Sequence, residues 1–132
     1  MSIAFRALAA ALALAAPVCA RAQAASAAEI KAVQSIVECL GQGLPPDFKR
    51  AEMIVELAKP GAKTGDVQYI LARGDPEQLE PFTPCDVRKP PRLLLDLRSR
   101  LAVKRRGWTK AYLVVQPDGQ FSLSYDYPKP GQ

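Results

Sequence analysis

The chain has 132 residues and a mass of 14.3 kDa, which is enough for one domain but not for two. Hydrophobic residues make up 48% and charged residues 23%, which excludes a wholly disordered chain and a collagen-like one. The formal charge is +5 and there is no histidine, so the commonest general base and the usual partner of a nucleophilic serine or cysteine are missing, and the composition argues against an enzyme.

Residues 1–24 have the order of features found in a secretory signal peptide. Arg6 gives the positive start, and the ten residues from Ala7 to Ala16 form an apolar run too short to span a bilayer. Two A-x-A triplets follow, and we predict cleavage after Ala22 or Ala24, where they end. A buried N-terminal helix is the alternative interpretation.

Cys19 lies within this segment, but Val18 and Ala16 do not give the pattern that lipidation of a cysteine needs. No later apolar run approaches the length of a membrane-spanning helix. We therefore expect residues 25–132 to form a single soluble domain in the periplasm, without stable membrane insertion.

Cleavage leaves two cysteines, Cys39 and Cys85, in an oxidising compartment. Their even number predicts one disulfide, which closes a loop of 46 positions and would stabilise the fold by roughly 4 kcal/mol in the chain-entropy model. Two free, buried thiols are the alternative. Two cysteines without histidine are too few ligands for a structural zinc site. The sequence also contains no phosphate-binding glycine loop, and we predict neither a metal nor a cofactor.

Residues 27–40 have apolar side chains at helical spacing and predict the first helix. Ser26 is a candidate N-cap, with Glu29 three residues later as in a capping box. Gly41 and Gly43 are expected to end the helix.

Two runs of alternating side chains, 48–57 and 67–72, predict antiparallel strands joined by a glycine-containing loop. In the first run Glu52 and Glu56 would lie about 13 Å apart, farther than the paired carboxylates of a glycosidase, and we interpret them as solvent-facing charges. Residues 74–91 contain five prolines and are predicted to form a loop that the disulfide restrains.

Leucines at helical spacing predict a second helix over residues 92–106, with Gly107 after it. The last turn of this helix would carry Lys104, Arg105 and Arg106, where cations interact favourably with the helix dipole.

The last predicted unit is a hairpin around Asp118-Gly119, a strong turn sequence. Its first strand starts at Trp108, on the face that also carries Lys110, Tyr112 and Val114, and its second strand covers residues 121–127 with Phe121, Tyr125 and Tyr127 on one face. We expect cross-strand packing of these aromatic side chains, with an exposed tyrosine-rich contact surface as the alternative.

The predicted order of the mature chain is therefore α-β-β-α-β-β. Hairpins favour antiparallel pairing, and two amphipathic helices can cover one face of a sheet. The expected fold is an α+β two-layer sandwich, with a four-stranded antiparallel sheet covered by two helices.

Charge is segregated along the chain. Nine basic residues and one acidic residue, Asp96, lie between Arg88 and Lys110, whereas residues 25–80 carry six basic and nine acidic residues. Such segregation suits an acidic protein, an anionic lipid or a nucleic acid, and an exported protein seldom meets nucleic acid. A solvated helix face is the alternative interpretation.

Several short motifs occur in a particular order: Leu44-Pro45-Pro46, Leu94 with Asp96-Leu97-Arg98, Trp108, Asp118-Gly119-Gln120-Phe121 and Tyr125-Asp126-Tyr127. Together with the order of elements they resemble the YezG-like immunity proteins, which neutralise bacterial toxins by binding them. The resemblance covers most of the mature chain in element order and about 35 C-terminal residues in sequence.

This resemblance implies a protein that is not an enzyme, binds no cofactor, and neutralises a nearby-encoded toxin by stoichiometric occlusion. Family members are usually cytoplasmic and acidic, whereas this chain is basic and carries an export segment, so its toxin should act in the periplasm or on the envelope.

We select Arg98, Arg100, Arg105 and Tyr127 as partner contacts. Trp108, Asp118, Gly119, Phe121 and Tyr125 are interpreted as the structural motif of the last hairpin. The alternative function is an exported module that binds an anionic envelope component, lipid or glycan, through its basic second helix.

Overall fold

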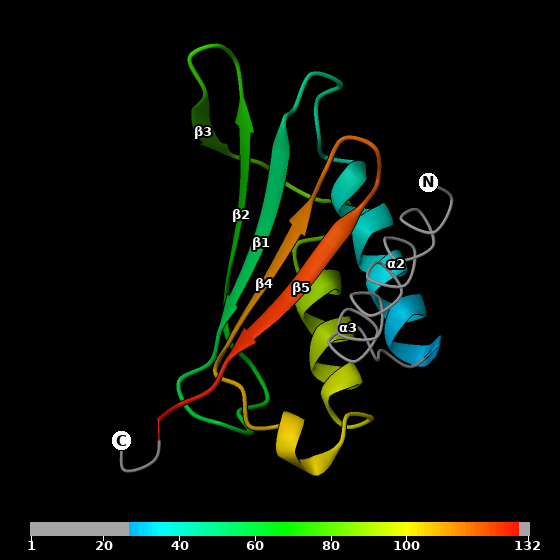
Figure 1. Cartoon of the computed structure of the whole chain (residues 1–132), viewed down its shortest axis with the longest axis vertical. Coiled ribbons are helices and arrows are strands. Elements are labelled where there is room, and N and C mark those ends of the chain that lie inside the picture. Colours follow the sequence, from blue (N-terminus) through cyan, green and yellow to red (C-terminus); the bar gives the residue numbers. More distant parts are fainter. Residues whose placement is uncertain (1–26, 130–132) are drawn as a thin grey trace, which may run out of the picture. The chain divides into compact units, whose positions relative to one another are not determined.

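The computed structural model describes residues 27–129, so the predicted signal peptide, its cleavage site and the Ser26 cap lie outside the described residues. The compact unit that begins at Lys31 is described here. It is an α+β unit with two α-helices and a five-stranded antiparallel sheet (Figure 1).

The elements follow one another along the chain as α2 (Ala27–Gly41), β1 (Arg50–Glu56), β2 (Asp66–Arg73), β3 (Gln78–Pro81), α3 (Lys89–Arg98), the 3-10 turn η1 (Val103–Arg105), β4 (Lys110–Val115) and β5 (Phe121–Asp126). In space the strands lie in the order β3-β2-β1-β4-β5, so β1 is central and α3 lies in the connection between the two hairpins. The first helix, the strands β1 and β2, and the last hairpin occur where the sequence predicts them.

The prediction of a four-stranded sheet is wrong, because β3 adds a fifth strand within the region expected to be a loop. This strand pairs only with β2, with Ile70 opposite Pro81 and Arg73 opposite Gln78. Its four residues are mostly exposed and show no alternating apolar pattern. It becomes a strand because the turn after β2 returns the chain along an edge with free hydrogen-bonding groups.

The predicted extent of the second helix is also wrong, since α3 begins at Lys89 and ends at Arg98. The backbone N–H and the side-chain hydroxyl of Ser99 both donate to the Asp96 carbonyl, at 3.3 and 2.8 Å, which tightens the last turn. Ala102 is then extended, with ψ of 147°.

This earlier helix end moves the three cations expected in the last helical turn. Lys104 and Arg105 lie in η1 and Arg106 follows it, so they do not stand at the end of α3. The basic residue in the last turn of α3 is Arg98 instead.

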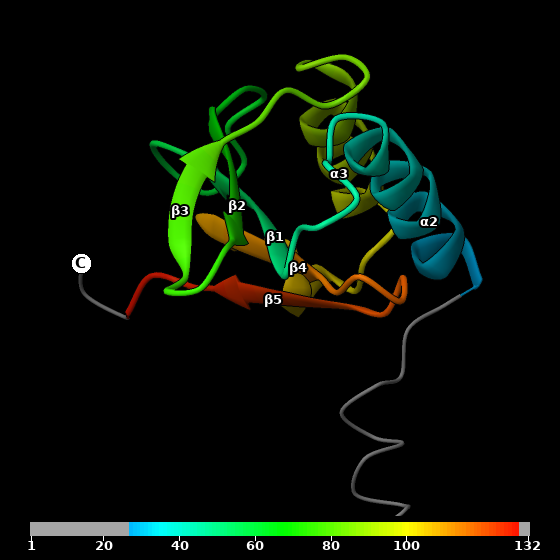
Figure 2. The same ribbon diagram turned by 90° about the horizontal axis from the view of Figure 1, so that it is seen from above.

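The helices α2, from Lys31 onward, and α3 cover the same face of the sheet (Figure 2). Strands β1 and β4 alternate between buried side chains and half-buried or exposed ones, as the sequence pattern requires. The core between helices and sheet contains Val33, Ile36, Leu40, Met53, Val55, Leu94, Leu97, Trp108 and Leu113. The opposite, helix-free face carries Glu52, Ile54 and Tyr112.

The sequence pattern predicts that Trp108 shares a face with Tyr112 and Val114, and this prediction is wrong. Its side chain is fully buried, whereas those two residues are half-exposed on the helix-free face. The indole stacks on Tyr125, with ring centroids 5.3 Å apart. Trp108 precedes β4, so the alternation of the strand does not fix the direction of its side chain. Burial of the indole on the helix side removes more apolar surface from water.

The Cys39–Cys85 disulfide is confirmed, with the two Cα atoms 4.9 Å apart. The Cys85 amide also donates to the Cys39 carbonyl at 2.9 Å. A side chain at Gly43 would overlap the Thr83 carbonyl, so glycine lets the chain before Cys85 pass close to the end of α2.

The predicted turn of the last hairpin is confirmed. Gly119 has a φ of +90°, a conformation that glycine adopts readily, and the Gln120 amide donates to the Asp118 carboxylate at 2.9 Å. Phe121 and Tyr125 both follow on β5, where Phe121 is exposed and Tyr125 is half-buried against Trp108.

Candidate functional site

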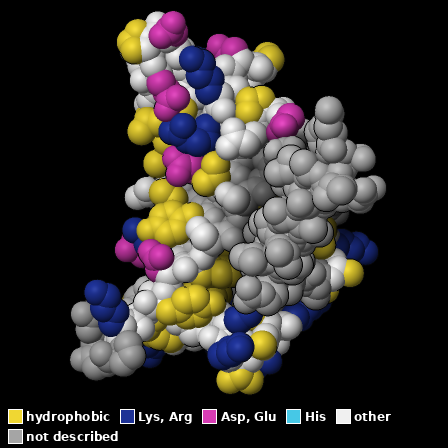
Figure 3. Space-filling view, viewed as in Figure 1, with side chains coloured by type: hydrophobic (Ala, Val, Ile, Leu, Met, Phe, Trp, Pro, Cys, Tyr) yellow, Lys and Arg dark blue, Asp and Glu magenta, His cyan; other side chains and the backbone are white. Residues whose placement is uncertain are grey.

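The most basic part of the chain forms an exposed surface that begins at Arg88, just before α3, and continues along this helix and after it. We call this the α3 surface and define it by the side chains of Arg88, Lys89, Arg92, Arg100 and Lys104, all of them exposed. Within residues 27–129, none of these five side chains forms an ion pair. Around η1, Figure 3 likewise shows Lys and Arg side chains without Asp or Glu between them.

The start of α3 explains why this positive charge comes from side chains rather than from backbone groups. Proline occupies the first helical positions, at Pro90 and Pro91, and proline has no N–H to offer to an anion. The Arg88 amide is already used, because it donates to the Asp86 carboxylate at 2.9 Å. Arg88 and Arg92 are four residues apart and therefore project along one side of the helix.

Beside this row of arginines lies an open groove of about 550 Å³, between α3 and the loop from β1 to β2. Its apolar lining comes from Val67, Val87, Pro91 and Leu95. Three cations also line it, Lys63, Arg88 and Arg92, against the single carboxylate of Asp96. We call this the α3 groove; it combines an apolar interior with an excess of positive charge.

One wall of the α3 groove is tied to the sheet by Tyr69. The buried Tyr69 hydroxyl donates to the Val87 carbonyl at 2.7 Å, and the Phe82 amide donates to the Tyr69 carbonyl at 3.2 Å. Burial, with a smaller contribution from the nearby Asp86 carboxylate, raises the pKa of Tyr69 to about 12. With the disulfide at Cys85, these contacts hold Val87 and the start of α3 in place.

The opposite wall depends on a close approach at Gly65. A Cβ atom there would lie 2.6 Å from the Glu56 carbonyl and 2.6 Å from the Leu57 side chain. Glycine therefore lets the loop carrying Lys63 and Thr64 lie against the end of β1. Both walls of the groove are thus fixed by contacts with the sheet.

The residues predicted as partner contacts divide into two kinds. Arg100 is exposed in the turn after α3, whereas Arg98 is half-buried, with its guanidinium 6.0 Å from the centroid of the Trp108 ring. The Tyr127 hydroxyl donates to the Arg105 carbonyl at 3.1 Å, and the Tyr127 ring packs edge-on against Tyr125.

The structure thus places Arg98 directly on Trp108, while Tyr127 contacts Tyr125, which stacks on Trp108, and joins the backbone of Arg105. Because the Arg98 side chain packs against the indole, replacing it would disturb the core as well as the surface. Arg100 is the predicted contact that can be changed without this complication.

The α3 groove was not predicted from the sequence, although Arg88 and Arg92 belong to the basic stretch. The groove forms because Lys63 and Val67, from the β1–β2 region, lie against a helix that begins more than twenty residues later. The four-residue spacing of Arg88, Arg92 and Asp96 is the one local pattern that indicates a shared helix face.

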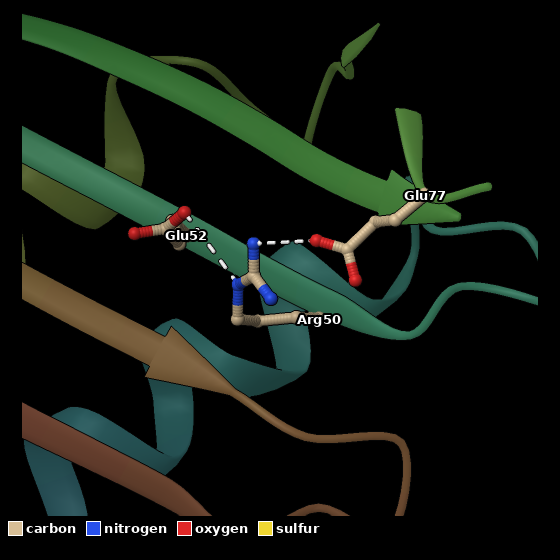
Figure 4. A network of polar contacts seen from close by, with 3 residues as sticks. All are labelled: Arg50, Glu52 and Glu77. Carbon is tan, nitrogen blue, oxygen red and sulfur yellow. Dashed lines mark hydrogen bonds and ion pairs between the residues drawn. The ribbon is translucent and has the colours of Figure 1, made fainter. Parts of the chain in front are cut away.

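A second charged surface, on the strands, differs from the α3 surface in its pairing. We call it the β1–β3 surface and define it by Arg50, Glu52, Arg73, Glu77 and Glu80. Arg50 lies between two carboxylates, 3.7 Å from Glu52 and 3.0 Å from Glu77 (Figure 4). Arg73 lies 3.4 Å from Asp47 and 3.2 Å from Glu80, so both arginines are neutralised within the chain.

Lys110 belongs to the basic stretch in sequence but to the strands in space. Its ammonium lies 5.3 Å from the centroid of the Tyr112 ring, whose hydroxyl donates to the Asp126 carboxylate at 3.1 Å. Tyr112, followed by the carboxylates of Glu56 and Asp126, raises the pKa of Lys110. The ammonium group of Lys110 therefore interacts with side chains of the sheet and does not belong to the α3 surface.

Among residues 27–129 there is no group of three or more His, Cys, Asp or Glu side chains placed to hold a metal ion. None of the helices in this range has the length and apolar character needed to span a membrane. Comparison with known protein families and with curated proteins finds no match to the chain. The resemblance to immunity proteins stays a prediction.

Proposed function

We propose that the protein is a periplasmic immunity protein, which binds a bacterial toxin and neutralises it by stoichiometric occlusion. Support comes from the sequence motifs around Trp108 and the last hairpin, from the export segment and from the charge distribution. In this proposal the chain carries out no chemistry of its own and acts through surface complementarity.

The observation that carries this proposal is the lack of ion pairs at the α3 surface. Both strand arginines, Arg50 and Arg73, are neutralised by carboxylates of the same chain. The five cations of the α3 surface have no such partner among the described residues. Clustered like charges repel one another, and an acidic partner relieves this repulsion and is drawn to the surface during encounter.

Co-expression with the product of the neighbouring gene tests the proposal. We expect export of this protein to protect cells against that product and the two proteins to co-purify as a stoichiometric complex. If the toxin remains active and no complex forms, the immunity function is wrong.

Charge reversal then tests whether the α3 surface makes the contact. The double substitution Arg100→Glu with Lys104→Glu should weaken the complex and leave the melting temperature nearly unchanged, because both side chains are exposed. The matched control is Lys49→Glu with Lys129→Glu, which changes the net charge equally at two other exposed positions. Equal weakening by both pairs would show that only net charge matters.

A second function, binding of an anionic envelope component, is favoured by the same unpaired cations. In that case vesicles containing phosphatidylglycerol, or an anionic glycan, would bind the purified protein while the neighbouring gene product would not. Binding of this kind should weaken steeply with salt, since it would rest on charges in solvent.

A further inference from the structure

The lining of the α3 groove combines apolar side chains with an excess of cations. Its interior is lined by Val67, Val87, Pro91 and Leu95, and the Val87 side chain is 47% exposed. At its edges are the cations Lys63, Arg88 and Arg92. An occupant of matching chemistry would bring apolar atoms to the interior and negative charge to the edges.

The shape of the groove favours a segment of a larger partner over a free small molecule. Small-molecule sites commonly enclose most of the ligand surface, about 70–90%. This groove is open to solvent, and Lys63, Arg88 and Arg92 of its lining are all exposed. A polypeptide can place one apolar side chain in such a groove and obtain the rest of its contacts from the surrounding surface.

The charges of the groove identify the kind of segment. Three cations face one carboxylate, Asp96, and among the described residues none of the three cations is neutralised by an ion pair. A neutral or basic segment would leave these charges without partners, whereas Asp and Glu side chains flanking an apolar residue would pair with them.

The groove is also held in place before any partner arrives. Tyr69 and the Cys39–Cys85 disulfide restrain the wall that carries Val87, and the close approach at Gly65 restrains the other. A pre-formed groove lowers the entropy cost of ordering loops on binding.

We infer that the α3 groove is the docking site for an acidic segment of the protein partner, in which an apolar side chain packs against Val67, Val87 and Leu95 while neighbouring Asp or Glu side chains pair with Lys63, Arg88 and Arg92. This inference rests on the proposed function and adds to it the site of contact and the chemistry of the partner segment.

Nuclear magnetic resonance of the ¹⁵N-labelled protein with a synthetic peptide tests the site. The probe is the acidic peptide GDELFEDG, titrated to about 5 mM so that even a millimolar complex is detected. We expect amide shifts in residues 63–67 and 87–96. The counterpart with Asn and Gln at the acidic positions, and the counterpart with Ser in place of Leu and Phe, should each bind at least about tenfold more weakly.

Two variants and a matched control complete the test. Arg88→Glu with Arg92→Glu should raise the peptide Kd at least about tenfold, because two attractive charges become repulsive. Val87→Glu should remove binding, since it places a carboxylate in the apolar interior while keeping the backbone carbonyl that Tyr69 needs. Lys49→Glu with Lys129→Glu changes the net charge equally outside the groove and should leave the Kd unchanged.

Several outcomes would overturn the inference: no shifts at the groove, equal binding of the Asn and Gln peptide, or groove shifts with phosphatidylglycerol vesicles but not with GDELFEDG. The last result would identify a lipid surface as the occupant instead.

Failure of this inference is distinguishable from failure of the proposed function. If the wild-type protein protects cells and the Arg88→Glu, Arg92→Glu variant protects equally well, the groove is not the docking site but the immunity function stands. If the peptide binds the groove and the wild-type protein protects against no neighbouring toxin, the immunity function fails while the site stands.

Discussion

The arginines of the β1–β3 surface form ion pairs within the chain, whereas those of the α3 surface form none within residues 27–129. On the strands, Arg50 and Arg73 each lie within 4 Å of two carboxylates, at distances from 3.0 to 3.7 Å. In the α3 surface, Arg88, Arg92 and Arg100 are exposed, and none has an ion-pair partner within the described part of the chain.

The two surfaces therefore differ in which charges are paired within the fold and which are not. Surface ion pairs contribute little stability each, about 0–1 kcal/mol, but here they neutralise both strand arginines, which are then not available to an acidic partner. The position of α3 depends instead on packing against the core residue Trp108, on the disulfide and on the hydrogen bond of Tyr69. The cations of the α3 surface are not needed to keep the helix in place, and they are available for binding.

The largest expected effect concerns the support beneath α3. Trp108→Ala should lower the free energy of unfolding by about 3–5 kcal/mol, because the indole is fully buried and stacks on Tyr125. Guanidinium denaturation followed by circular dichroism measures the change, since the only tryptophan is lost. Trp108→Phe is the control and should retain part of that stability. A cost below about 1 kcal/mol for the alanine variant would contradict a core role for Trp108.

The disulfide comes next. Cys39→Ser with Cys85→Ser should lower the free energy of unfolding by about 2–4 kcal/mol, because the closed loop spans 46 positions. Hydrogen exchange should speed up most at Val87 and along the first turns of α3, which lie directly after Cys85. Exchange that speeds up equally on β4 and β5 would mean that the disulfide stabilises the whole fold and not the groove wall in particular.

Tyr69 should give a smaller, pH-dependent effect. Its pKa is raised from 10.0 to about 12, so the protonated hydroxyl is favoured in the folded state. The stability that it contributes is fully present below pH 10 and is lost as the pH rises through about 12. Tyr69→Phe should lose about 1 kcal/mol at neutral pH, with the hydrogen bond to Val87, and should lack this alkaline decline. Parallel alkaline declines in both proteins would assign the effect to other groups.

The smallest effect belongs to the β1–β3 surface. Arg50→Gln should cost about 0.2–1 kcal/mol, since Arg50 and its two carboxylate partners are partly exposed. A double-mutant cycle with Glu77→Gln measures the coupling, which should shrink as salt is added. Partner binding should not change in either variant. If it weakens as much as in the Arg88→Glu, Arg92→Glu variant, the two surfaces do not differ in the way described above.

Local patterns in the sequence predicted most of the fold. The alternation along β1 and β4, the helical spacing in α2, and the Asp118-Gly119 turn depend on neighbouring residues only, and all were placed correctly. The disulfide followed from the number of cysteines left after the predicted cleavage. Residues whose position depends on distant contacts were predicted poorly. The strand β3 exists through its pairing with β2, and Trp108 turns toward the helices because only that side can cover an indole.

The same division holds for the candidate site. The gathering of positive charge between Arg88 and Lys110 can be read from the sequence alone, since charge is a property of composition. Which of these cations lack partners depends on the tertiary structure. Lys110 is engaged by Tyr112 on the sheet and Arg98 packs on Trp108, while Arg88 and Arg92 meet Lys63 from a distant loop at an apolar groove. A charge acquires partners, or lacks them, through packing between segments that are far apart in the chain, and no local pattern carries that information.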